Sequence, residues 1–144
     1  MSTNPHLLPV ELEKAYRLIN HGPTVMVSSS HEGAHNVMAA AWACALDYAP
    51  PKVTVVIARD TKTRELIEKS GVFALQVPTA AQVGMTQCVG SQSLGETPDK
   101  LQRCGVELFH VEGFPVPLVR GCSAWLACRV IPEPHNQEAY DLFI

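Results

Sequence analysis

Residues 52–58, KVTVVIA, form a short and nearly continuous run of β-branched and apolar side chains. The run follows Pro50 and Pro51, which end the element before it, and it precedes a polar loop at residues 59–63. Runs of this length and composition are typical of a strand that is buried on both faces. Residues 52–58 are therefore the clearest strand of the chain, and the other elements are interpreted around it.

Further apolar runs bounded by turn residues predict more strands. They are residues 24–30, 36–46, 72–77, 106–111 and 123–131. Helical spacing of apolar residues predicts the helices, which are residues 10–20, 63–70, 79–89 and 99–104. Many short strands with a few inserted helices favour a mainly β fold, a closed or nearly closed barrel. Strict strand–helix alternation is missing, so a Rossmann sheet fits poorly.

The length and composition suit a single globular domain. The chain has 144 residues, of which 47% are hydrophobic and 17% charged, and its formal net charge is -3. No basic run is present, which argues against a nucleic-acid partner. No apolar run of ~18 residues could cross a membrane as a helix. The first 13 residues lack the pattern of a signal peptide, so we expect a cytoplasmic protein.

The five cysteines are Cys44, Cys88, Cys104, Cys122 and Cys128. An odd number without an export signal favours reduced, cytosolic thiols. No CxxC motif and no Cys/His cluster with zinc spacing occurs. Cys44, Cys122 and Cys128 lie in apolar runs, and we expect them to be packing residues.

A polar loop with three cations follows the buried strand and opens a predicted helix. Its residues 59–64 read RDTKTR, with Thr61 and Thr63 among the cations. Unpaired N–H groups and the dipole favour anions at a helix N-terminus, so a terminal phosphate suits this place. The alternative is a solvated turn in which Thr61 or Thr63 is an N-cap and nothing more.

Residues 36–42, NVMAAAW, combine an amide with small side chains. Small residues let a flat ring approach the backbone, whose N–H and C=O groups could pair with the ring's hydrogen-bonding edge. The alternative is tight packing between neighbouring strands. Trp42 is more often a core or interface residue than a stacking partner.

Two weaker candidates remain. The loop at residues 90–100, GSQSLGETPDK, is long enough to act as a lid or a dimer contact, although its end could simply start a helix. The six histidines share no spacing and suit surface or turn positions, with His35 of interest because it precedes Asn36. No GxGxxG, P-loop or GxSxG motif is present.

The order of these motifs resembles the flavin reductase-like family. The matching pieces are residues 36–42, Pro50 with Pro51, the strand after them, the loop with Arg59, and residues 70–78. The resemblance covers roughly residues 22–131. Members of the family include flavoredoxins and the reductase components of two-component monooxygenases. It implies an FMN-binding split β-barrel, usually a homodimer with flavin near the subunit interface.

The resemblance also implies which residues meet the flavin. Those beside it are Ser28 and Ser29. Those that line the isoalloxazine, largely through backbone groups, are Asn36, Val37, Met38, Ala39, Ala40 and Ala41. Those that hold the phosphate are Arg59, Thr61, Lys62 and Thr63.

The activity that follows is an NAD(P)H-dependent flavin reductase, in which NADH or NADPH passes hydride to FMN and no dedicated acid–base residue is needed. One alternative is a flavoredoxin-like FMN electron carrier, with a partner monooxygenase or electron-transfer protein. Another is a split-barrel binding module that has lost its flavin. The chain departs from the family in two ways. Many relatives have Ser-Gly where this chain has Leu94-Gly95. Relatives also extend ~40 residues or more beyond the last residue of this chain, so we expect the domain to lack its natural C-terminal part.

Overall fold

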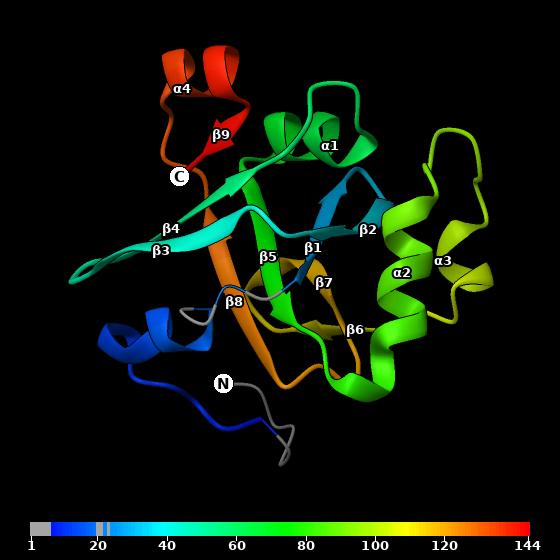
Figure 1. Ribbon diagram of the computed structural model, residues 1–144, viewed down its shortest axis with the longest axis horizontal. Helices are drawn as coiled ribbons and strands as arrows, with labels where there is room; N and C mark the ends of the chain where they lie inside the picture. Colours follow the sequence, from blue (N-terminus) through cyan, green and yellow to red (C-terminus); the bar gives the residue numbers. More distant parts are fainter. Residues whose placement is uncertain (1–6, 20–21, 23) are drawn as a thin grey trace.

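A computed structural model describes residues 7–19, 22 and 24–144, and a four-stranded antiparallel sheet lies at its centre (Figure 1). The strand order is β2-β1-β5-β8. The bounds are Val25–His31 for β1, Ala34–Ala40 for β2, Val72–Val77 for β5 and Ala124–Arg129 for β8. Glu32 and Gly33 form the turn between β1 and β2, and both have positive φ, 47° and 83°.

Two smaller sheets flank the central one. The first has the order β3-β4-β9, with bounds Ala43–Tyr48, Pro51–Val56 and Leu142–Phe143. The second pairs β6 with β7, at Leu108–Val111 and Phe114–Val119. The three sheets do not close into one cylinder. The mainly β, split-barrel fold class is therefore confirmed, and a fully closed barrel is not formed.

The helices lie around these sheets. Their bounds are Leu12–Leu18 for the 3₁₀ helix η1, Lys62–Ser70 for α1, Ala80–Gln82 for the 3₁₀ turn η2, Val83–Ser91 for α2, Lys100–Arg103 for α3 and Pro134–Tyr140 for α4. In Figure 1, α2 and α3 stand together on one side, whereas η1 and the β3–β4 hairpin lie on the other. Within the described ranges, no helix is long and apolar enough to cross a membrane.

The central strand β1 separates two apolar clusters. Val25 and Val27 pack with residues of β4, β5 and β9 on one face. Met26 points to the opposite face and packs with Val37, with Val89 of α2 and with neighbouring residues. Because strand side chains alternate between faces, one strand can serve both clusters, and its residues 25–30 are all buried.

Two predicted elements differ from the structure. Residues 36–46 are not one strand, because Ala41 and Trp42 are exposed where the chain leaves β2 and enters β3 in another sheet. The helix expected at residues 10–20 is a 3₁₀ helix without a buried residue, and Leu12 is 70% exposed. The predicted end of this helix, residue 20, lies outside the described residues, as do His6 and His21.

The cysteine expectations were partly wrong. Cys88 and Cys104 form a disulfide, so the prediction of reduced thiols fails for this pair. Cys44 is exposed, because it lies on the outer face of β3, and it is no packing residue. Cys122 is buried and Cys128 half-buried, as expected, and burial raises the pKa of Cys122 to about 11 and that of Cys128 to about 12.

Gly90 sets how closely α2 packs on β2. A Cβ added at Gly90 would lie 2.9 Å from the Cβ of Ala39. Gly90→Ala is therefore expected to lower the free energy of unfolding by about 1–3 kcal/mol in urea titrations, the usual cost of overpacking. Gly84→Ala in the same helix is the control, since its added Cβ would meet nothing within 4 Å. It should be neutral or stabilising by up to ~1 kcal/mol, so equal losses in both variants would refute the steric explanation.

Candidate functional site

Helix α1 begins where the polar loop after β4 ends. Thr61 is the N-cap, and its Oγ1 accepts a hydrogen bond from the backbone N–H of Arg64 at 3.2 Å. Gly71 ends the helix in the left-handed conformation, with φ 71°. The predicted succession of strand, loop and helix is confirmed, with α1 starting one residue earlier than expected. The N-terminus of α1 presents the unpaired N–H groups that favour an anion.

A cavity of about 300 Å³ lies at this helix start. Its lining combines the loop, the first turn of α1 and the segment after α2, and comprises Arg59, Asp60, Thr61, Lys62, Glu65, Ser93 and Gly95. Three of the four residues predicted to hold a phosphate, Arg59, Thr61 and Lys62, therefore lie together. The fourth, Thr63, is fully buried and does not line the cavity.

The cations of the cavity have protein partners. Lys62 Nζ lies 2.7 Å from Glu65 Oε2, and Lys69 binds the other oxygen of the same carboxylate. These hydrogen bonds lower the pKa of Glu65 to about 2. Arg59 donates to the carbonyl of Glu138 and stays 68% exposed. Both side chains are accessible enough to exchange these partners for an anion.

Arg64, the third cation of the loop motif, points away from the cavity. Its side chain is 6% exposed and binds Asp141 Oδ1 at 2.6 Å and Glu68 Oε1 at 2.8 Å. It also donates to the carbonyl of Gln137 at 2.8 Å. Of the three cations in the loop motif, Arg64 therefore does not face the cavity, because its place on the helix directs it toward α4 and β9.

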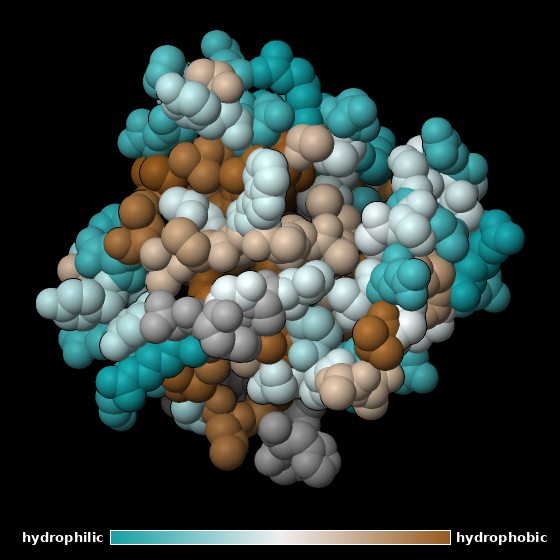
Figure 2. Space-filling view, viewed as in Figure 1, coloured by the Kyte–Doolittle hydropathy of each residue, from teal (hydrophilic) through white to brown (hydrophobic). Residues whose placement is uncertain are grey.

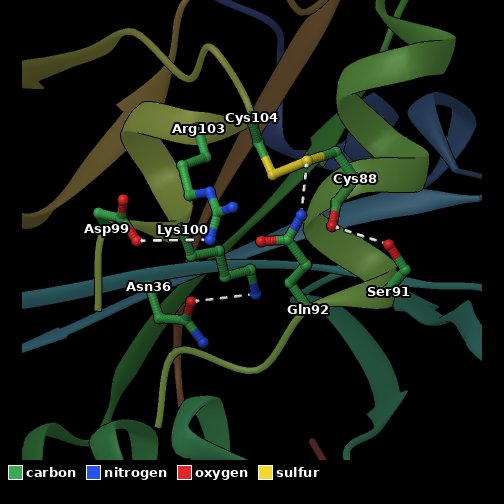
Figure 3. The surroundings of a disulfide bond; sticks show 8 residues. All are labelled: Asn36, Cys88, Ser91, Gln92, Asp99, Lys100, Arg103 and Cys104. Carbon is green, nitrogen blue, oxygen red and sulfur yellow. Dashed lines mark hydrogen bonds and ion pairs between the residues drawn. A yellow bond between two sulfur atoms is a disulfide. The ribbon is translucent and has the colours of Figure 1, made fainter. Parts of the chain in front are cut away.

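A buried chain of hydrogen bonds connects α1 to β2 and α3. Asn36 Nδ2 donates to Thr63 Oγ1 at 2.9 Å, and Lys100 Nζ donates to Asn36 Oδ1 at 3.3 Å (Figure 3). The exposed fractions are 0% for Thr63, 3% for Asn36 and 2% for Lys100. Thr63 therefore positions the Asn36 side chain and does not face the cavity. Their hydrogen bond connects the predicted phosphate loop to the predicted ring strand.

Lys100 is the site residue that sequence reasoning missed. It was placed at the end of a loop, where a lysine is normally solvated. Burial lowers its pKa to about 8. The only sequence signal was its position at a helix start beside the Gly- and Ser-rich stretch at residues 90–98.

The two serines of β1 differ in what they face. Ser28 accepts a hydrogen bond from Gln76 Nε2 at 2.6 Å and belongs to the interior. Ser29 lies opposite Asn36 in the antiparallel register, which puts their side chains on the same face. Its Oγ is buried and has no hydrogen-bond partner among the described residues. An unpaired buried hydroxyl beside Asn36 is what a polar ligand could satisfy.

Most side chains of the predicted ring strand serve the core. Val37, Met38 and Ala40 pack into the apolar clusters, and Ala41 is exposed. Because β2 is an edge strand, its outer backbone groups have no strand partner in the part of the chain that the structure describes. Ala39 lines a second cavity, of about 700 Å³, together with residues that include Gly90 and Ser91. The last residues of α2 thus line the larger cavity, and Ser93 and Gly95, just after the helix, line the smaller one.

The remaining predictions concern Trp42 and His35. Trp42 is 75% exposed, so it is no core residue. His35 Nδ1 and Ser30 Oγ share a hydrogen bond of 2.8 Å, and the His35 ring lies edge-on to that of His110. Burial, with a smaller contribution from His110, lowers the pKa of His35.

Comparisons with known proteins agree with this geometry. A family model described as the flavin reductase like domain matches residues 16–144. The uncharacterized protein YddH of Escherichia coli (strain K12) is 42% identical over 137 residues, which cover 93% of this chain and 72% of YddH.

Two solved structures are similar as well. The FMN-binding domain of a flavin reductases-like enzyme from Shewanella baltica OS155 has 65% sequence identity and a TM-score of 0.91, covering 93% of this chain and 70% of that one. Flavoredoxin of Desulfovibrio vulgaris (Miyazaki F) has 27% identity and a TM-score of 0.71, covering 78% and 61%. The chain thus spans between 61% and 72% of the length of these three relatives.

The family match includes every element from η1 onward, apart from the first residues of η1. It therefore contains the edge strand β2, the cavity at α1 and the segment after α2. The resemblance inferred from the motif order is confirmed, and the chain belongs to the family of flavin reductase like domains.

Proposed function

We propose that this chain binds FMN in a single domain, with the phosphate in the cavity at the start of α1. The observation that carries the proposal is the lining of that cavity by Arg59, Thr61 and Lys62 at a helix N-terminus. Cations and free N–H groups suit a doubly charged phosphate monoester. The Shewanella baltica structure, at 65% identity, is described as an FMN-binding domain, which supports the same ligand here.

The isoalloxazine then lies along the outer edge of β2. The unpaired groups of that edge match the alternating donors and acceptors of the ring, and small residues such as Ala39 and Ala41 leave room for it. Asn36 of β2 and Ser29 Oγ of the neighbouring strand β1 supply further polar atoms. The neighbouring cavity of about 700 Å³ is within the usual range of small-molecule sites, roughly 300–1,000 Å³.

The reaction that we propose is reduction of FMN by NADH or NADPH. Bound FMN supplies the hydride acceptor, and the protein positions it and limits access to one ring face. Arg59, Lys62 and the start of α1 hold the phosphate, while Asn36, fixed by Thr63 and Lys100, holds the strand beside the ring. No residue of the chain needs to transfer a proton in this reaction.

A flavoredoxin-like electron carrier is the second candidate, supported by the 27% identity to the Desulfovibrio vulgaris flavoredoxin. In that case FMN stays bound and exchanges electrons with a protein partner, such as a monooxygenase or another electron-transfer protein. Oxidation of NADH and NADPH, followed at the nicotinamide absorbance band with added FMN, distinguishes the two. If neither nucleotide is oxidised although FMN remains bound through gel filtration, the chain is a carrier.

We also propose that the chain forms a homodimer through the outer face of β3. On that face Leu46 and Tyr48 of β3 are 51% and 63% exposed, and Trp42, directly before the strand, is 75% exposed. Figure 2 shows hydrophobic residues gathering on the side of the molecule where β3, β4 and β9 lie. Exposed apolar patches of this kind commonly mark protein interfaces.

Removal of both cavity cations tests the phosphate position. The double variant R59A/K62A is expected to weaken FMN binding by ~2–4 kcal/mol, because each charge-assisted hydrogen bond contributes ~1.5–3 kcal/mol and the two are not fully additive. Quenching of flavin fluorescence measures the affinity. Lys69→Ala is the matched control, since Lys69 shares the Glu65 carboxylate with Lys62 but does not line the cavity. An unchanged affinity in the double variant would show that the phosphate lies elsewhere.

A further inference from the structure

The Cys88–Cys104 disulfide closes a segment that borders the whole proposed flavin site. Cys88 lies in the last turn of α2 and Cys104 directly follows α3, so the bridge joins two helices across 16 residues of sequence (Figure 3). The intervening stretch at residues 92–99 is non-helical. Some of its backbone hydrogen bonds run within the stretch, for example from Thr97 N to Ser93 O at 2.9 Å, and others join it to α3, such as Arg103 N to Asp99 O at 2.9 Å.

Both cavities and the buried lysine depend on this segment. Gly90 and Ser91 line the larger cavity, and Ser93 and Gly95 line the smaller one beside the cations. At its other end Lys100 holds Asn36 of the edge strand. Any movement of the segment therefore changes the walls of both cavities at once.

The disulfide fixes the turn that carries Lys100. Helix α3 has only four residues, too few to be stable alone. The N–H of Cys104 donates to the carbonyl of Lys100 at 2.9 Å, so the lysine and the bridge are one turn apart. Gln92 Nε2 donates to Cys88 Sγ at 3.3 Å, which attaches the start of the stretch to the same bridge. The cross-link thus anchors both ends of the segment. The hydrogen bond from Lys100 to Asn36 attaches the segment to β2 as well.

We propose that the Cys88–Cys104 disulfide is a redox switch on flavin affinity, in which the bridged form holds the segment closed and the reduced form releases it. The inference rests on the FMN binding proposed above. A dithiol reductant supplies two electrons and two protons: the S–S bond breaks, two thiols form on Cys88 and Cys104, and the reductant becomes a disulfide. Cys88 is the more exposed residue of the two, so we expect the reductant to attack at its sulfur.

The switch lowers affinity by a population shift. After reduction α3 can leave the sheet, Lys100 separates from Asn36, and Ser93 and Gly95 leave the cavity wall. If the closed form is then about one tenth of the molecules, the apparent Kd for FMN rises about tenfold. In the reducing cytoplasm that the sequence predicts, the thiol–disulfide balance would set how much of the protein holds flavin.

The test compares FMN titrations of the oxidised protein, the dithiothreitol-reduced protein and the variant C88S/C104S. We expect the reduced protein and the variant to bind about tenfold more weakly, with restoration on reoxidation. Cys128→Ala is the matched control: Cys128 is a free, half-buried cysteine of β8 that lines neither cavity, and its loss should leave both affinities unchanged. By reciprocity, FMN should shift the thiol–disulfide equilibrium of the bridge toward the disulfide, measured by thiol labelling at equilibrium with the reductant.

The outcomes separate the two proposals. Equal FMN affinity in the oxidised and reduced protein would overturn the switch and leave FMN binding intact. Failure of the oxidised protein to bind FMN would overturn the proposed function itself. Far-UV circular dichroism of the reduced wild type covers the case in which the serine variant does not fold. Reduction that unfolds the wild type would also refute the switch, because the bridge would then be needed for folding.

Discussion

Replacing Lys100 by methionine is expected to remove a pH-dependent cost of about 3 kcal/mol, which lowers the stability of the wild type below about pH 8 and is lost by about pH 10.5. Burial lowers the pKa of Lys100 from 10.5 to about 8, and one pKa unit corresponds to about 1.36 kcal/mol. Between about pH 8 and pH 10.5 the unfolded chain keeps the proton that the folded chain has released. Stability rises with pH wherever the unfolded state binds more protons. The free energy of unfolding of the wild type should therefore rise across this window relative to that of Lys100→Met.

Urea unfolding at several pH values from 7 to 11 measures this difference. Other lysines and tyrosines titrate in the same range, but they are common to both proteins and cancel when the variant is subtracted. Arg103→Met on the same helix is the control, because Arg103 is exposed and lies 3.9 Å from an exposed Asp99. A constant difference between wild type and Lys100→Met over the whole range would mean that Lys100 is not desolvated.

Lys100 shows that a sequence pattern predicts local secondary structure more reliably than it predicts the burial of a side chain. The stretch before it is rich in Gly and Ser, and it was interpreted as a loop followed by a helix, which is what forms. The burial of Lys100 follows from tertiary contacts. Asn36, whose Oδ1 accepts the hydrogen bond from Lys100 Nζ, is 64 residues away in the sequence. No periodicity in the chain encodes that contact.

The strands were predicted well where side chains decide the structure. Residues 72–77 were predicted with the bounds that β5 has. A short apolar run between two turn residues indicates a buried strand, because it is too short for a helix. Residues 36–46 were predicted as one strand because nothing local marks the change of sheet. The break at Ala41 and Trp42 is set by β3 pairing with β4, a non-local contact.

In the candidate site, too, local features were predictable and tertiary contacts were not. Thr61 as N-cap and Lys62 and Arg59 at the cavity follow from the rules for helix starts and were predictable. The partners of Thr63 and Arg64 were not, because the direction of each side chain depends on which elements cover α1. The disulfide was missed because composition predicts the redox compartment, whereas pairing depends on the distance between α2 and α3, with Cα atoms 5.5 Å apart.

Replacing Arg64 by methionine is expected to cost about 3–5 kcal/mol of stability, the second large effect. The guanidinium is buried, lies over the ring of Phe143 at 5.1 Å, and binds Asp141 at 2.6 Å and the Gln137 carbonyl at 2.8 Å. Methionine keeps the apolar stem but leaves these acceptors without their donor. Loss of one partner of a buried ion pair is far more costly than loss of a surface pair. Chemical denaturation of the protein without flavin measures the change.

Glu68→Gln separates the buried interactions of Arg64 from its surface one. Glu68 is 52% exposed, so its pair with Arg64 should contribute no more than about 1 kcal/mol. Because Arg64 reaches residues of α4 and the start of β9, Arg64→Met should also speed amide hydrogen exchange at residues 134–143 before the rest of the fold opens. Uniform acceleration over all strands would contradict this. It would show that Arg64 supports the whole barrel rather than the attachment of α4 and β9 to the helix at the proposed phosphate site.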